Sequence, residues 1–88
     1  MTTYIVTYDL SNEADYTALY TELKATKYWA RINESVWAVV TDETAAQLRD
    51  RLLTVLNDEQ DRLFVIKSGV EAAWKNVVCS NDWLKKWL

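Results

Sequence analysis

The chain has 88 residues, enough for one domain over residues 1–88, and half of them are hydrophobic, which excludes a disordered chain. It contains no histidine and a single glycine, so histidine-dependent nucleophiles, histidine metal sites and glycine-rich phosphate loops are excluded. The net charge of −3 weighs against a phosphate-rich partner, although a local basic patch would still allow one.

No stretch approaches the roughly 18 apolar residues of a membrane helix, and the N-terminus lacks the pattern of a signal peptide. We therefore expect a cytoplasmic protein with no membrane partner. The lone Cys79 cannot form an internal disulfide and is expected to be a small buried apolar residue.

The first strand is predicted over residues 3–10. Strict alternation divides its side chains between two faces, one with Tyr4, Val6 and Tyr8 and the other with Ile5, Thr7 and Asp9. Both faces therefore carry apolar or aromatic bulk, and the strand ends in a single carboxylate.

A helix follows the first strand. Ser11 or Asn12 is the predicted N-cap, and Glu13 and Asp15 suit the positive end of the helix dipole. The buried stripe repeats at the three-four spacing of one helix face, and the helix is expected to end near residue 26; the stripe consists of Tyr16, Leu19, Tyr20 and Leu23.

Two strands are predicted over residues 28–32 and 35–40, joined at Asn33 and Glu34 in a hairpin. Asp42 is the expected cap of a second helix, which is followed by a polar loop over residues 57–61. The predicted buried stripe of this helix is Ala45, Leu48, Leu52, Val55 and Leu56, and its predicted water-facing residues are Gln47, Arg49, Asp50 and Arg51.

The fourth strand is predicted over residues 62–67 and stops at Ser68 and Gly69. Residues 70–78 fit a short helix, a strand or a loop equally well. Residues 80–82 are predicted to cap a last short helix over residues 83–88, in which Trp83 with Trp87 and Leu84 with Leu88 meet at i, i+4.

The order of these elements predicts an α+β, ferredoxin-like βαββαβ fold: a four-stranded antiparallel sheet with two helices on one face, plus a short C-terminal helix. Because apolar positions occur on both faces of the sheet, we expect the helix-free face to be covered by a second copy of the chain.

Asp9 is the strongest candidate for chemistry. A carboxylate at the end of a central strand can hold Mg²⁺, which often uses only one or two carboxylates, and a two-fold dimer would supply two copies. Water activated by the metal could then attack a phosphodiester without histidine. The structural alternative is an aspartate that bonds backbone amides in the turn before the helix.

Other polar and aromatic residues have a functional and a structural interpretation. Ser35, with Asn33 and Glu34, could contact a phosphate or the metal shell, or could simply form the turn. Trp37 could stack on a base, but the glycine-aromatic signature of the RNA-recognition module is missing, so we interpret it as core or interface. The basic pairs are interpreted as solvated surface: Lys24 with Lys27, Arg49 with Arg51, and Lys85 with Lys86.

Several short motifs carry a family resemblance. Residues 4–10 (YIVTYDL) resemble the first strand of the small CRISPR-associated nuclease family, the ferredoxin-like subunit of the spacer-acquisition complex. Residues 35–37 (SVW) resemble that family's Ser-Val-Phe, and residues 61–66 (DRLFVI) resemble its fourth strand, so the likeness covers about residues 3 to 68. The virulence-associated protein D toxins share this fold.

The likeness is closer to a group of bacterial proteins labelled SinR-like. These carry Ala-Trp after the fourth strand and end in Trp-Leu-Lys-x-x-Leu, as Ala73 with Trp74 and residues 83–88 (WLKKWL) do here.

The resemblance implies that Asp9 is a candidate catalytic and metal-binding residue, with Mg²⁺ as the candidate metal, and that the protein dimerises through its sheet faces. The acidic charge and the helical tail depart from the CRISPR-associated family, which tends to be basic and often ends in a fifth strand. Our first hypothesis is a homodimeric binding or scaffold module in a defence or toxin–antitoxin context. The alternative is a Mg²⁺-dependent endonuclease on RNA or DNA. A third hypothesis, a small-ligand regulatory domain of the same topology, rests on fold analogy alone.

Overall fold

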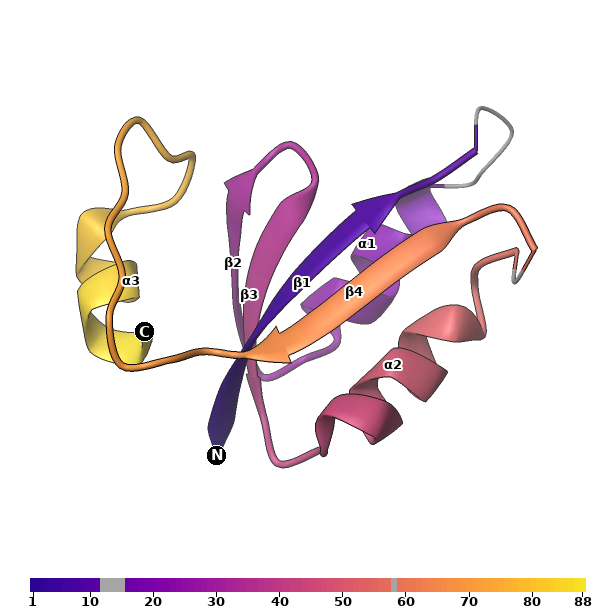
Figure 1. Cartoon of the computed structure of the whole chain (residues 1–88), viewed down its shortest axis with the longest axis horizontal. Coiled ribbons are helices and arrows are strands. Elements are labelled where there is room, and N and C mark those ends of the chain that lie inside the picture. The colour runs from indigo at the N-terminus through magenta and orange to yellow at the C-terminus, as the bar shows by residue number, and fades with distance from the viewer. Residues whose placement is uncertain (12–15, 58) are drawn as a thin grey trace.

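A computed structural model describes residues 1–11, 16–57 and 59–88 (Figure 1). The elements in chain order are β1 (Thr2–Asp9), α1 (Tyr16–Lys24), β2 (Tyr28–Asn33), β3 (Val36–Thr41), α2 (Ala45–Leu53), β4 (Arg62–Lys67) and α3 (Asn81–Trp87). None of the helices among these residues is long and apolar enough to cross a membrane.

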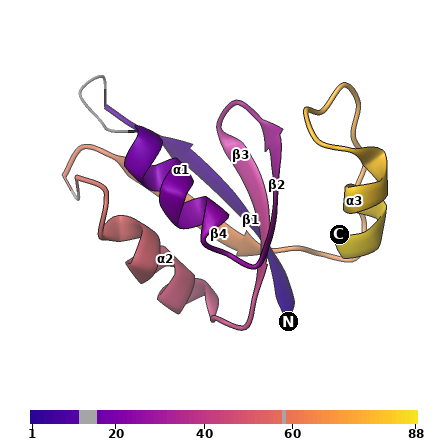
Figure 2. The same ribbon diagram turned by 180° about the vertical axis from the view of Figure 1, so that it is seen from behind.

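The four strands form one antiparallel sheet in the order β2-β3-β1-β4. Strand β1 lies between β3 and β4, as the split-βαβ arrangement requires. Helices α1 and α2 lie together on one face of the sheet, which is clearest from behind (Figure 2). The predicted α+β, ferredoxin-like fold is therefore confirmed.

The core lies between the sheet and these two helices. Alternation along β1 works as predicted, because Tyr4, Val6 and Tyr8 are buried whereas Asp9 is exposed. The buried core cluster consists of Tyr4, Val6, Tyr8, Leu10, Leu19, Leu23, Trp37, Val39, Leu48 and Leu52.

Helix α1 ends at Lys24, slightly earlier than the predicted end near residue 26. Its predicted start cannot be compared, because Asn12, Glu13 and Asp15 lie outside the described residues.

Helix α2 corrects the predicted cap. Thr44 rather than Asp42 is the N-cap: its hydroxyl accepts from the Gln47 amide at 3.1 Å, and the Gln47 side chain accepts from the Thr44 amide at 2.9 Å. Asp42 instead lies 3.4 Å from the N-terminal ammonium. The helix ends at Leu53, so Val55 and Leu56 pack against the core from the segment that follows it.

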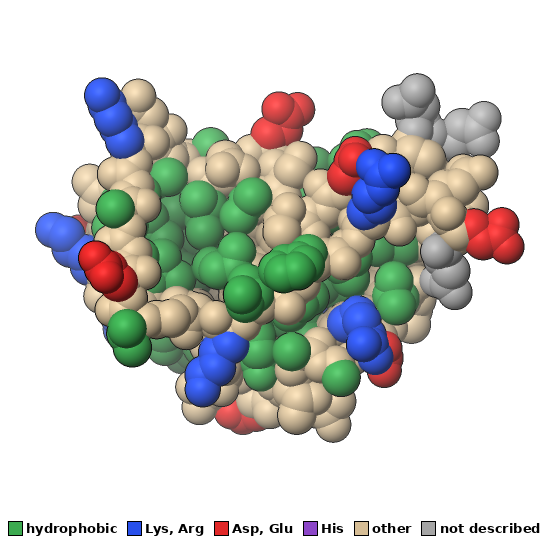
Figure 3. Space-filling view, viewed as in Figure 1, with side chains coloured by type: hydrophobic (Ala, Val, Ile, Leu, Met, Phe, Trp, Pro, Cys, Tyr) green, Lys and Arg blue, Asp and Glu red, His purple; other side chains and the backbone are tan. Residues whose placement is uncertain are grey.

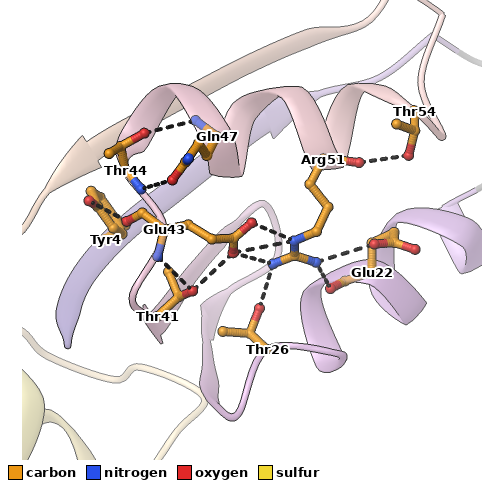
Figure 4. Close-up of polar contacts among 9 residues, drawn as sticks. All are labelled: Tyr4, Glu22, Thr26, Thr41, Glu43, Thr44, Gln47, Arg51 and Thr54. Atoms are coloured by element: carbon orange, nitrogen blue, oxygen red, sulfur yellow. Dashed lines mark hydrogen bonds and ion pairs between the residues drawn. The ribbon is translucent and has the colours of Figure 1, made fainter.

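Arg51 does not face water as predicted. Its side chain is only 26% exposed, and its guanidinium donates to the Glu43 carboxylate, to the Glu22 carbonyl and carboxylate, and to the Thr26 hydroxyl (Figure 4). A helical period cannot reveal this contact, because the partners belong to α1, the segment after α1 and the segment before α2.

The C-terminal tail turns back onto the helix-free face of the sheet. Residues 68–80 form no helix or strand, and the Val78 amide donates to the Ile32 carbonyl at 2.8 Å. Ser80 caps α3, which begins at Asn81, and the Trp83 and Trp87 rings meet at 6.3 Å as predicted. The tail therefore covers part of the face that the sequence analysis left for a second copy.

Candidate functional site

Asp9 is the last residue of β1, and its side chain is 71% exposed. It has the same parity as Ile5 and Thr7, so it lies on the face of the sheet opposite α1 and α2. Its place at the end of a central strand, on the helix-free face, agrees with the sequence prediction.

Arg62 is the partner that sequence reasoning missed. The register of β1 and β4 places Arg62 opposite Asp9, and its guanidinium nitrogen lies 2.9 Å from the Asp9 carboxylate. The topology indicates only that the start of β4 lies near the end of β1, because the two strands are antiparallel neighbours, and the register decides that Arg62 is opposite Asp9. Asp9 thus forms an exposed ion pair with Arg62, while the turn of its structural alternative lies outside the described residues.

Asp61 binds two backbone amides beside the Asp9–Arg62 pair. Its two carboxylate oxygens accept from the Ser11 amide at 2.8 Å and from the Asn57 amide at 2.9 Å. These bonds lower the pKa of Asp61 and tie the segment before β4 to the residues that follow β1. The backbone on both sides of the Asp9–Arg62 pair is therefore anchored.

Tyr8 anchors the site from the core side. Its hydroxyl donates to the Glu34 carbonyl at 3.1 Å and accepts from the Trp37 indole nitrogen at 3.0 Å. Burial raises the pKa of Tyr8 to about 12, so it stays a neutral structural group near physiological pH.

The hairpin residues act here through their backbone. The Ser35 carbonyl accepts from the Tyr8 amide at 3.2 Å, which holds the hairpin beside the end of β1. Trp37 is 1% exposed and belongs to the core, so its face is not available to a nucleic-acid base.

An exposed apolar patch adjoins Asp9. The cross-strand register joins Ile5 to Ile66 and Thr7 to Phe64 on the helix-free face, and we call these four residues the β1–β4 patch. Phe64 is 58% exposed and Ile66 is 51% exposed. Figure 3 shows hydrophobic side chains gathered on this face between α3 and β4.

An open cavity of about 290 Å³ connects the patch with the ion pair. Its lining includes Thr7 and Phe64 of the patch, together with Asp9 and Arg62. The carboxylate and the apolar surface therefore form one continuous candidate site.

The lysines of the predicted basic pairs lie away from the Asp9–Arg62 pair. Lys24 and Lys27 lie over the rings of Trp29 and Tyr28, each at 5.5 Å, and Lys86 lies 5.1 Å over Trp87. The Trp87 carbonyl bonds to Thr3, near the end of β1 opposite Asp9, so Lys86 is at the other end of the strand. Cys79 is only half-buried, where we predicted a buried residue, and desolvation raises the pKa of its thiol.

The described donor set does not make a Mg²⁺ site within one chain. No group of three or more His, Cys, Asp or Glu side chains suited to a metal occurs among residues 1–11, 16–57 and 59–88. Asp9 brings one carboxylate, and that carboxylate is paired with Arg62. Mg²⁺ is often held by one or two carboxylates, with water and substrate phosphates completing its shell, so Asp9 would supply one carboxylate and a second copy would supply another.

Comparisons with known proteins agree with this geometry. The model of a family described as CRISPR associated protein Cas2 matches residues 1–76. The crystal structure of a hypothetical protein TT1823 from Thermus thermophilus superposes with a TM-score of 0.65 at 26% sequence identity, over 84% of this chain and 92% of that chain. No match is found among curated proteins.

Proposed function

Since this chain belongs to the CRISPR associated protein Cas2 family, we propose that it acts as a homodimeric binding or scaffold module of a CRISPR-type defence system. In this dimer the β1–β4 patches of two copies face each other. The observation that carries the proposal is the exposure of Phe64 and Ile66, at 58% and 51%, on the face of the sheet opposite the helices that cover the core.

The position of Asp9 fits a two-fold dimer of this kind. Asp9 adjoins the β1–β4 patch, and an isologous interface repeats every contact about its axis. Pairing the two patches would therefore bring two Asp9–Arg62 pairs toward the same axis.

Two features favour binding over catalysis. The Asp9 carboxylate is engaged by a guanidinium at 2.9 Å, which competes with a metal ion for its oxygens. The net charge of −3 also weakens long-range attraction of nucleic-acid phosphates.

Introducing a charge into the β1–β4 patch tests the dimer. In sedimentation velocity the wild-type chain should form a dimer, and Phe64→Glu should raise the dissociation constant by about tenfold or more, because the interface would bury an unpaired carboxylate. The matched control is Thr21→Glu, which adds the same charge at an exposed position of α1. A wild-type chain that stays monomeric up to about 100 µM would refute the homodimer.

The endonuclease alternative is kept because Asp9 is exposed at the end of a central strand, where a fold can supply a ligand. Bound Mg²⁺ would activate water for attack on a phosphodiester. If the alternative holds, labelled RNA or duplex DNA will be cleaved with Mg²⁺, and cleavage will be lost with EDTA and in Asp9→Asn. Absence of cleavage in the wild type under these conditions would leave the scaffold function.

A further inference from the structure

The helix-free face has one covered part and one exposed part. Ala30, Ala38, Ile5 and Ile66 lie side by side in one cross-strand row of this face. Ala30 and Ala38 are 5% and 0% exposed, whereas Ile66 is 51% exposed. Because α1 and α2 lie on the other side of the sheet, we attribute the burial of the two alanines to the C-terminal tail, which contacts this face at Thr3, Tyr28 and Ile32.

Helix α3 provides this cover through a few side chains. The Thr3 hydroxyl donates to the Trp87 carbonyl at 2.8 Å, and the Trp87 ring stacks on Tyr28 at 4.8 Å between ring centres. Val40 lies between Tyr28 and Thr3 in the next cross-strand row and is 1% exposed. Leu84 is likewise 1% exposed and is the buried residue of α3. We call Tyr28, Ala30, Ala38 and Val40 the α3 seat.

Only a few contacts are described that keep α3 docked on its seat. The helix has seven residues, and a helix this short is not stable in water without packing. It is joined to β4 only through residues 68–80, which form no helix or strand. An open cavity of about 210 Å³ separates Leu84, Lys85 and Leu88 from residues 69–72 and Trp74, so the segment that leads to α3 is not closely packed against the helix.

Release of α3 would expose Leu84 and the α3 seat, but it would leave the core cluster in place. The core cluster lies between the sheet and helices α1 and α2; its last member is Leu52, and Val65 is the last residue given as packed against it. The family match ends at residue 76, so α3 is also an addition to the part of the chain that the family model describes.

We propose that α3 is an autoinhibitory cap on the self-association surface. Docked α3 confines a second copy to the β1–β4 patch, and release of α3 opens the α3 seat to the same partner. The occupant is a second copy because the α3 seat continues into the β1–β4 patch along the row from Ala38 through Ile5 to Ile66. This inference rests on the proposed homodimer.

Two variants of the full chain loosen the cap. Trp87→Ala removes the ring that stacks on Tyr28, and Thr3→Val removes the hydrogen bond to the Trp87 carbonyl while keeping the shape of the side chain. The control is Lys85→Ala, an exposed position on the same helix. Hydrogen exchange of the Val78 amide, which donates to Ile32, reports docking of the tail. Sedimentation velocity reports self-association.

The cap predicts faster exchange at Val78 and a dissociation constant lower by about tenfold in both variants, with Lys85→Ala like the wild type. Unchanged exchange in both variants would show that these contacts do not hold a releasable cap, and it would overturn the inference. Faster exchange with an unchanged or weaker dimer would overturn it as well, while the homodimer would stand. If every form is monomeric, the proposed function and the cap both fail.

Discussion

Arg51 connects three separate segments of the chain through one guanidinium. It bonds to Glu43 before α2, to Glu22 on α1 and to Thr26 after α1, and the three charged side chains are only 26% to 32% exposed. Partly buried charges depend on their partners, because an unpaired one is left without adequate hydration.

Replacing Arg51 should therefore destabilise the fold. We expect Arg51→Met to lower the free energy of unfolding by about 2 kcal/mol, because Glu43 and Glu22 lose their cation. Urea unfolding followed by tryptophan fluorescence measures this change. The control Arg49→Met, at a side chain 54% exposed, should stay within about 0.5 kcal/mol of the wild type. Equal losses in both variants would contradict a special role for Arg51.

The same cluster makes stability depend on pH. Hydrogen bonds from Arg51 lower the pKa of Glu43 below its ordinary value, so the folded state binds this proton less tightly than the unfolded state. The stabilisation is complete above the ordinary glutamate pKa of about 4.3 and is lost as the pH falls through the lowered value. Urea midpoints should therefore decrease below about pH 4.3. In Glu43→Gln this acid-side decrease should be smaller, and an unchanged profile would argue against the assignment.

At the scale of single elements, the start of a helix depends on residues that the periodicity of the sequence does not reveal. The α2 stripe residues Leu48 and Leu52 were predicted from the three-four repeat and are buried. The start of the helix depends instead on the reciprocal bonds between Thr44 and Gln47. Asp42, two positions earlier, has a suitable side chain but is used to pair the N-terminus.

Removing the capping hydroxyl should shorten or weaken α2. Thr44→Ala should lower the free energy of unfolding by about 1 kcal/mol, because the Gln47 amide loses its acceptor. Thermal unfolding followed by circular dichroism is the measurement. Thr21→Ala makes the same substitution within α1, where alanine has the higher helix propensity, so it should not destabilise the protein. A loss of similar size at both positions would exclude the cap as the cause.

At the scale of the whole molecule, charge and apolar surface oppose each other. Two copies that carry −3 each repel, while the exposed Phe64 and Ile66 favour their association. The molecule measures 34 × 27 × 20 Å. These dimensions are similar to the distance over which charges interact at 0.01 M salt, a screening length of roughly 30 Å. Repulsion between copies should thus act across the whole dimer at low salt.

Self-association should strengthen when this repulsion is screened. Between about 0.01 M and 0.15 M sodium chloride, where the screening length falls to about 8 Å, we expect the dissociation constant of the dimer to decrease severalfold. Sedimentation equilibrium across this range measures it. Glu59→Gln, which removes one exposed negative charge, should reduce the salt effect. A dimer that weakens with salt would point to ion pairs across the interface in place of apolar contact.

The sequence by itself determined the local structure of the protein and the surface on which Asp9 lies. Alternation along β1 and the three-four repeats of the helices reflect the backbone periods of 2 and 3.6 residues. These periods can be recognised in one segment of sequence without knowing which other segments pack against it. Their order predicted the split-βαβ sheet and placed Asp9 with Ile5 and Thr7 on the helix-free face.

Only the tertiary structure decided which distant side chains meet. Asp9 and Arg62 are 53 positions apart, Arg51 and Glu22 are 29 apart, and Thr3 and Trp87 are 84 apart. Such contacts depend on strand register and on the path of the tail, and the local periods of the sequence contain neither. For the same reason, only the folded chain revealed that α3 covers part of the face that apolar patterning had left open.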